Sequence, residues 1–244
     1  MIQSCAFHIL LFSLGFSILF AEKKDEYFNA GSVLLNRESE MRNSTYTYLA
    51  LGDSYTIGES VPVTESFPYQ TVQMLRNSGY DFQAPEIIAR TGWTTDELQA
   101  AINKYTFRPS YDFVTLLIGV NNQYRGRSAS EYEEEFDSLL RQSVRFAGGK
   151  SGHVIVLSVP DWGVTPFAEG RDRQKIRNEI DEFNRINKNI AVKNGVHYIN
   201  ITPGTREAKD DKTLLAADKL HPSAREYERW AKKISTFISN TLAQ

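Results

Sequence analysis

The stretch YLALGDSYTIGES, residues 48–60, begins with residues suited to the interior of a sheet and changes character at Gly52, Asp53 and Ser54. Its continuous apolar run predicts a strand over Thr47–Gly52 that is covered on both faces. Gly-Asp-Ser is also a common turn tripeptide, because Asp and Ser side chains bond nearby backbone and Gly accepts positive φ. The stretch alone therefore leaves two interpretations of Ser54, as a turn residue or as a nucleophile.

Short apolar runs like this one recur along the chain and alternate with segments of helical periodicity. Together they predict five strands, at Thr47–Gly52, Glu86–Arg90, Asp112–Gly119, His153–Val159 and Val196–Ile201. Parallel strands joined by right-handed helical crossovers produce this alternation. We predict an α/β fold, a three-layer α/β/α sandwich with a five-stranded parallel sheet and flavodoxin-like topology.

Cap signals indicate where the intervening helices begin. Four starts are predicted by a residue pair at the beginning of an apolar stripe: Ser66 with Pro68, Thr94 with Glu97, Ser128 with Glu131, and Ser223 with Glu226. A further helix is indicated by apolar residues spaced three or four positions apart between Ile176 and Ile190.

The composition is that of a soluble globular protein, with 41% hydrophobic residues and a formal net charge of -2 in 244 residues. We predict one domain over residues 45–244, which is long enough to hold a core without a disulfide or a metal. The one cysteine, Cys5, excludes a disulfide framework. The near-neutral charge and the lack of basic runs argue against a nucleic-acid partner. No oligomeric state is indicated.

The amino end has the character of a targeting segment. Residues 1–21 contain no Asp, Glu, Lys or Arg, and their apolar part from Ile9 to Ala21 is short for a membrane span. We predict a signal peptide over residues 1–21, with an uncleaved membrane anchor as the alternative, followed by a polar lead-in over residues 22–44. The expected location is secreted, periplasmic or at the cell envelope, with association to a membrane surface through the N-terminus as an option.

Polar residues suited to catalysis follow the predicted strands. Ser54 follows the first strand, Gly92 the second and Asn121 the third, while Asp218 and His221 lie in the last loop. In open parallel sheets, ligands bind beyond the carboxyl ends of the strands. A serine nucleophile needs a base and a group that orients the base, and His221 with Asp218 can supply both.

These residues resemble the SGNH/GDSL hydrolase family, whose blocks contain a serine in Gly-Asp-Ser, a glycine after the second strand, an asparagine in Gly-x-Asn-Asp and a carboxyl-terminal Asp-x-x-His. The blocks occur in the family's order from Thr45 to the last helix. The resemblance implies Ser54 as nucleophile, Asp218 and His221 as its triad partners, and Ser54, Gly92 and Asn121 as oxyanion-hole donors.

Three positions depart from the family's pattern: Asn122 replaces an acid, Lys219 replaces a common glycine, and Tyr55 replaces Leu or Ile. None of them removes a catalytic group. We expect Asn122 to affect loop bracing, Lys219 to add a charge near the site, and Tyr55 to reshape its mouth.

Substrate contacts are predicted for Asp53, Tyr55, Trp93, Asn122 and Trp162. The loop over residues 161–173 is long enough to form a lid. Trp93, Trp162 and Phe167 could line an acyl pocket, although aromatic residues at strand ends more often pack into the core.

The resemblance implies a serine esterase that hydrolyses an acyl or acetyl ester of a lipid, a glycan or a small molecule. The catalytic residues require no metal and no organic cofactor, and motifs for a Walker loop, a dinucleotide fold or a zinc protease do not occur. Two alternatives stay open: an acyltransferase that uses a sugar hydroxyl as acceptor, and a non-catalytic flavodoxin-like module whose Ser54 loop binds a phosphate.

Overall fold

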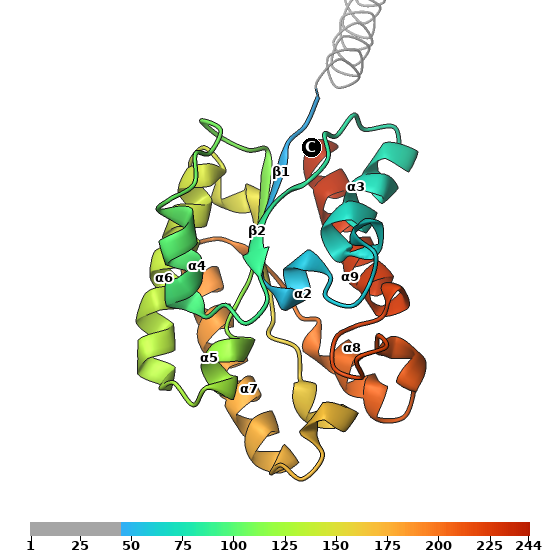
Figure 1. Cartoon of the computed structure of the whole chain (residues 1–244). Helices are drawn as coiled ribbons and strands as arrows, with labels where there is room; N and C mark the ends of the chain where they lie inside the picture. The colour runs from blue at the N-terminus through green and yellow to red at the C-terminus, as the bar shows by residue number, and fades with distance from the viewer. Residues whose placement is uncertain (1–44) are drawn as a thin grey trace, which may run out of the picture. The chain divides into compact units, whose positions relative to one another are not determined.

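The computed structural model describes residues 45–244, which form one compact unit (Figure 1). Its centre is a five-stranded sheet in which every pair of neighbours is parallel, in the order β2-β1-β3-β4-β5. The strands are β1 (Tyr48–Asp53), β2 (Glu86–Arg90), β3 (Phe113–Leu117), β4 (Val154–Leu157) and β5 (His197–Ile199). The predicted strand set and fold class are confirmed, with some strand ends differing by one or two residues.

Burial of the sheet follows from this strand order. Every residue of the central strands β1, β3 and β4 is buried, whereas the edge strands β2 and β5 contain partly exposed residues. A strand covered by helices on both faces needs apolar residues at successive positions. This explains why the continuous runs in the sequence correspond to the central strands.

Helices cover both faces of the sheet (Figure 1). One face packs against α3 (Phe67–Asn77) and α9 (Ala224–Leu242), and the other against α4 (Thr95–Ile102), α6 (Ala129–Phe146) and most of α7 (Arg173–Lys193). The remaining elements are short helices and 3-10 turns: α2 (Ser54–Ile57), α5 (Val120–Tyr124), α8 (Thr202–Arg206), η1 (Val63–Glu65), η2 (Ser151–His153), η3 (Trp162–Val164), η4 (Pro166–Ala168), η5 (Glu207–Lys209) and η6 (Lys212–Leu214).

The predicted capping residues differ in what they do. Thr94 and Glu97 form a capping box at the start of α4. The box expected at the start of α9 is wrong, although the helix does begin after Ser223. The Ser223 hydroxyl donates instead to the Thr213 carbonyl at 2.7 Å, and the buried Glu226 accepts from Trp230 Nε1 at 2.8 Å. Both side chains therefore bond to other partners and do not cap the helix.

The strand order reverses direction between β1 and β3, because the chain leaves β1 toward β2 and then returns to β3 on the other side. Ligands bind beyond the carboxyl ends of strands at such a switch point. The helices α2 and α5, which follow β1 and β3 directly, both lie at this end of the sheet in Figure 1. The fold thus places Ser54 and Asn121 at the position where a binding site is expected.

The predicted signal peptide or anchor and the polar lead-in, residues 1–44, lie outside the described residues. Within residues 45–244, none of the helices combines the length and the apolar character that crossing a membrane requires.

Candidate active site

A sharp turn presents Ser54 at the end of β1. Ser54 is the first residue of α2, and the Asp53 carboxylate caps this helix by accepting from the Tyr55 N–H at 3.0 Å. The turn brings Thr56 back over the strand, so that a Cβ at position 52 would lie 2.1 Å from the Thr56 hydroxyl oxygen. Glycine is therefore required at position 52 to begin a helix immediately after a buried strand.

His221 and Asp218 meet the serine in one chain of hydrogen bonds. Ser54 Oγ lies 2.9 Å from His221 Nε2, although the two residues are 167 positions apart in the sequence. His221 Nδ1 lies 2.6 Å from Asp218 Oδ2. The other oxygen, Asp218 Oδ1, accepts from the Leu220 and His221 N–H groups, each at 3.0 Å. The structure thus brings together the three residues predicted to form a triad.

Asp218 also accepts a hydrogen bond that the sequence analysis did not predict, from the Ser60 hydroxyl to Oδ2 at 2.8 Å. Partial burial acts to raise the pKa of Asp218, but the hydrogen bonds from His221, Leu220 and Ser60 lower it to about 2. Ser60 and Lys219 are the two non-glycine residues with positive φ within residues 45–244, at 66° and 60°. Backbone in this region costs free energy and is often found at functional sites.

The predicted oxyanion donors line the same pocket as Ser54. The Ser54 N–H is at the first position of α2, where it has no acceptor within the helix. Gly92 has φ of 85°, which favours glycine, and its carbonyl accepts from Arg125 Nη2 at 2.6 Å. Asn121 Nδ2 donates to the Trp93 carbonyl at 2.9 Å, and since an amide carries two N–H groups, this bond orients the side chain while leaving a second donor.

These groups share a pocket of about 530 Å³, including its open mouth. Ser54, Gly92, Asn121 and His221 all line it. The remaining walls are mainly aromatic and consist of Tyr55, Tyr124, Trp162 and Phe167, together with Thr91, Val120 and Leu220. A pocket with apolar walls and a few convergent polar groups is the usual form of a small-molecule site.

Two of the five predicted substrate contacts line this pocket. Tyr55 is one, and its ring centroid lies 4.9 Å from that of His221. Trp162 is the other.

The other three predicted contacts do not line this pocket. Asp53 is 1% exposed and caps α2, and Asn122 is fully buried with its amide on Thr95. Trp93 packs against the core on the α4 side of the sheet. Each of these residues is adjacent in sequence to a pocket residue, but it is not part of the pocket lining.

Tyr124 was not predicted as a pocket residue. It follows Asn121 by three positions in α5, so the two side chains lie on the same helical face. The three-residue spacing from Asn121 is the sequence signal that could have identified Tyr124.

The other histidines of residues 45–244 lie elsewhere. The His153 ring stacks on Phe113, with ring centroids 4.8 Å apart, and the His197 ring stacks on Phe237 at 3.8 Å. No group of three or more His, Cys, Asp or Glu side chains within residues 45–244 is arranged to hold a metal ion. His221 is therefore the base available to Ser54.

One curated protein is similar to this chain in sequence. A curated acetylxylan esterase of Geobacillus stearothermophilus is 26% identical over 144 residues, which are 54% of this chain and 62% of that protein. The chain thus matches less than two thirds of the length of this relative.

Solved structures share the fold. A lipase/acylhydrolase from Enterococcus faecalis has a TM-score of 0.64 at 19% identity, covering 81% of this chain and 97% of the other. An acetylxylan esterase from Geobacillus stearothermophilus has a TM-score of 0.62 at 21% identity, covering 81% and 96%.

The sequence pattern of one family extends over most of the domain. Residues 50–229 match the GDSL-like lipase/acylhydrolase family, and this range contains Ser54, Gly92, Asn121, Asp218 and His221. The protein belongs to the GDSL-like lipase/acylhydrolase family, a family of carboxylic ester hydrolases.

Proposed function

We propose that this protein is a serine carboxylic ester hydrolase in which Ser54 is the nucleophile, His221 the general base and Asp218 the residue that orients the base. The observation that carries the proposal is the continuous hydrogen-bond chain from Asp218 Oδ2 through His221 to Ser54 Oγ, with distances of 2.6 and 2.9 Å. A serine hydroxyl is a weak nucleophile at neutral pH and requires this kind of activation.

In the first half of the reaction, Ser54 Oγ attacks the ester carbonyl carbon while its proton passes to His221 Nε2. Asp218 accepts from Nδ1–H, which holds the ring in the required tautomer and stabilises the imidazolium that forms. The imidazolium then gives its proton to the leaving alcohol oxygen, leaving an acyl group on Ser54. In the second half, water attacks the acyl carbonyl with the same base and releases the acid.

The negative charge on the carbonyl oxygen needs hydrogen-bond donors that are already in place. We assign this role to the N–H groups of Ser54 and Gly92 and to the Asn121 amide, all of which line the pocket. Removing one such donor commonly lowers turnover by about 100-fold to 1,000-fold. Asn121 is the donor that can be removed by substitution, as Asn121→Ala.

The acetyl ester is the acyl type that the comparisons support best. The curated relative is an acetylxylan esterase. The walls close to Ser54 and His221 include the ring of Tyr55, which limits the space beside the nucleophile. We therefore propose a short acyl group.

The test compares the parent protein with Ser54→Ala and with Ser143→Ala. Ser143 is also buried, but its hydroxyl donates to the Leu139 carbonyl within α6. Release of acetate from ethyl acetate and labelling by a fluorophosphonate are measured for each. We expect the parent and Ser143→Ala to release acetate and to be labelled. In Ser54→Ala, we expect turnover to fall at least about 1,000-fold and labelling to be absent.

Equal hydrolysis by Ser54→Ala and the parent contradicts the assignment. Absence of labelling in a folded parent protein favours a non-catalytic binding module instead. Adding xylose and measuring free acetate beside the loss of ethyl acetate separates hydrolysis from transfer to a sugar hydroxyl, because transfer consumes ethyl acetate and forms a sugar ester without releasing acid.

A further inference from the structure

Three aromatic side chains form a connected cluster at the mouth of the Ser54 pocket, which we name the aromatic rim: Tyr124, Trp162 and Phe167. Their ring centroids are 5.4, 6.2 and 6.0 Å apart, so each ring contacts both of the others. Trp162 is 4% exposed, whereas Tyr124 is 43% exposed and Phe167 45% exposed. The rim therefore has a buried base and two rings that are accessible from solvent.

Buried polar contacts hold the base of the rim. Trp162 Nε1 donates to Gln123 Oε1 at 2.7 Å, and Gln123 Nε2 donates to Glu179 Oε2 on α7, also at 2.7 Å. Because Gln123 is buried beside Asn121 in α5, the indole orientation is tied to the helix that carries the oxyanion donor.

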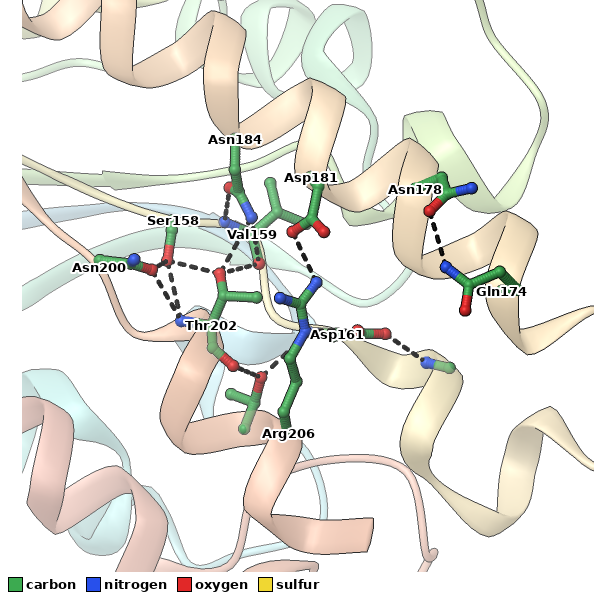
Figure 2. Close-up of polar contacts among 12 residues, drawn as sticks. Ser158, Val159, Asp161, Gln174, Asn178, Asp181, Asn184, Asn200, Thr202 and Arg206 are labelled. Atoms are coloured by element: carbon green, nitrogen blue, oxygen red, sulfur yellow. Dashed lines mark hydrogen bonds and ion pairs between the residues drawn. The ribbon is translucent and has the colours of Figure 1, made fainter.

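The segment that carries Trp162 is also fixed at its start, as Figure 2 shows. Asp161 caps η3 by accepting from Gly163 N–H at 2.9 Å and pairs with Arg206 Nε at 2.8 Å. Arg206 also pairs with Asp181 on α7 at 2.6 Å. Residues 161–164 are thus anchored to both α7 and α8.

A second set of contacts in Figure 2 anchors the chain just before this segment. Asn184 of α7 accepts from the Val159 N–H at 2.6 Å and donates to the Val159 carbonyl at 3.0 Å. Thr202 donates to the same carbonyl at 2.7 Å. A surface that is ordered before the ligand arrives binds at a lower entropic cost, so these contacts make the rim a preorganised binding surface.

Arg171 adds hydrogen-bond donors at the edge of the rim. Its guanidinium carbon lies 5.0 Å from the Tyr124 ring centroid and 5.6 Å from that of Trp162, and Nη2 donates to the Tyr124 hydroxyl at 3.2 Å. No acidic side chain within residues 45–244 forms an ion pair with Arg171, whose guanidinium carries five N–H groups. Donors thus remain for a ligand lying against the rings.

Half-exposed rings with polar groups at their edge match the chemistry of a sugar. A pyranose ring presents C–H groups on its faces, which the negative face of an aromatic ring attracts, and hydroxyl groups around its edge. A long acyl chain requires an enclosed aliphatic wall instead. The cavity with that character, lined by Leu214, Leu215 and Leu220, is small, and neither Tyr124 nor Phe167 lines it.

A lipid surface is also a poor match. Large exposed hydrophobic side chains within residues 45–244 are Val63, Tyr105, Tyr124, Phe167 and Val192, and of these only Tyr124 and Phe167 line the pocket mouth. Two rings do not form the broad apolar patch that docking to a lipid surface requires.

We propose that the aromatic rim, with Arg171 at its edge, is the subsite for a sugar ring in the alcohol part of the substrate, so that the protein is an esterase of acylated glycans. This proposal rests on the hydrolase function proposed above and adds the class of alcohol. The exposed rings of Tyr124 and Phe167 stack against the sugar, and the Arg171 guanidinium donates to its hydroxyl oxygens.

The test uses Phe167→Ala, with Tyr105→Ala as the matched control because Tyr105 is also 45% exposed but does not line the pocket. Each protein is assayed on acetylated xylobiose, ethyl acetate and ethyl octanoate. In Phe167→Ala, we expect the ratio of kcat/KM for acetylated xylobiose to that for ethyl acetate to fall about 10-fold, mainly through KM. Tyr105→Ala retains the parent ratio, and Arg171→Gln lowers it about 3-fold.

The proposal is contradicted if this ratio is unchanged in both Phe167→Ala and Arg171→Gln. It is also contradicted if the loss of activity is largest for ethyl octanoate, because that result assigns the rim to the acyl chain. Titration of xylobiose into Ser54→Ala and into Ser54→Ala/Phe167→Ala measures sugar binding without chemistry. Binding that weakens about 10-fold in the second protein supports the rim even if no ester is cleaved, and equal binding or none contradicts it. Failure of the sugar subsite and failure of the hydrolase are thereby distinguished.

Discussion

Two aspartates lie near the nucleophile: Asp53 is its neighbour in the sequence, and Asp218 is linked to it through His221. Their surroundings shift their pKa values in opposite directions. Asp53 precedes Ser54, is 1% exposed and has its pKa raised to about 7 by burial. Asp218 reaches the site through His221, its side chain is 30% exposed, and its pKa is lowered to about 2.

The number of donors explains much of the difference. Asp53 accepts a hydrogen bond from the Tyr55 N–H, which does not offset the loss of water around a buried carboxylate. Asp218 accepts from His221 Nδ1, the Ser60 hydroxyl and the N–H groups of Leu220 and His221. Of the two carboxylates, only Asp218 is therefore a dependable negative charge at neutral pH. The comparison indicates that the Asp53 side chain has a structural role, whereas Asp218 contributes its negative charge to the site.

The largest expected effect comes from neutralising Asp218. Asp218→Asn keeps the shape of the side chain but cannot stabilise an imidazolium, so we expect kcat on ethyl acetate to fall about 1,000-fold or more. Asp211→Asn is the matched control, because Asp211 also accepts from a nearby backbone N–H and a hydroxyl, both of Thr213, in an exposed loop. Similar activity of Asp218→Asn and Asp211→Asn contradicts the assigned role.

A smaller effect, on stability, is expected at Asp53. Its pKa rises from 3.8 to about 7 on folding, so the folded state holds the proton more tightly and stability falls as the pH rises from about 4 to about 7. Asn also serves as an N-cap but does not ionise. The free energy of unfolding of Asp53→Asn minus that of the parent should therefore be larger at pH 8 than at pH 4, by on the order of 3 kcal/mol.

Urea denaturation at several pH values measures this difference. The pH dependence of the free energy of unfolding is compared between Asp53→Asn and the parent. Parallel curves for the two proteins contradict the assignment of a raised pKa to Asp53.

The sequence predicted the fold and the approach of Ser54 to His221 because both depend on strong local signals. Buried parallel strands leave continuous apolar runs, and catalytic residues follow strand ends. Asp218 and His221 are three positions apart, which a single turn can join.

Side-chain direction after a strand end was the part that the sequence did not reveal. Trp93 and Asn122 sit beside pocket residues in the chain, yet Asn122 is buried and Trp93 is partly buried against the core on the α4 side of the sheet. The contact between Ser60 and Asp218 spans 158 positions and depends on positive φ at a serine, for which no local pattern gives a signal.

The smallest effect, and the one that separates hydrogen bonding from backbone strain near Asp218, is expected at Ser60. Ser60→Ala and Ser60→Gly both remove the hydroxyl that donates to Asp218, but only glycine accepts the positive φ at low cost. A hydrogen bond to a charged group contributes about 1.5 kcal/mol, so both variants should lose about 10-fold in kcat on ethyl acetate. Ser60→Gly should also be more stable than Ser60→Ala by about 1 kcal/mol.

Lys219→Gly is the matched control for strain, because it relieves a similar positive φ beside Asp218 and leaves the hydroxyl of Ser60 in place. We expect it to raise the free energy of unfolding by up to about 1 kcal/mol while kcat stays within about 2-fold of the parent. If Ser60→Gly instead recovers the activity that Ser60→Ala loses, strain rather than the hydroxyl governs the Asp218 loop. In that case the hydrogen bond from Ser60 contributes little to the role of Asp218 in turnover, and that role depends on the donors from His221 and the backbone.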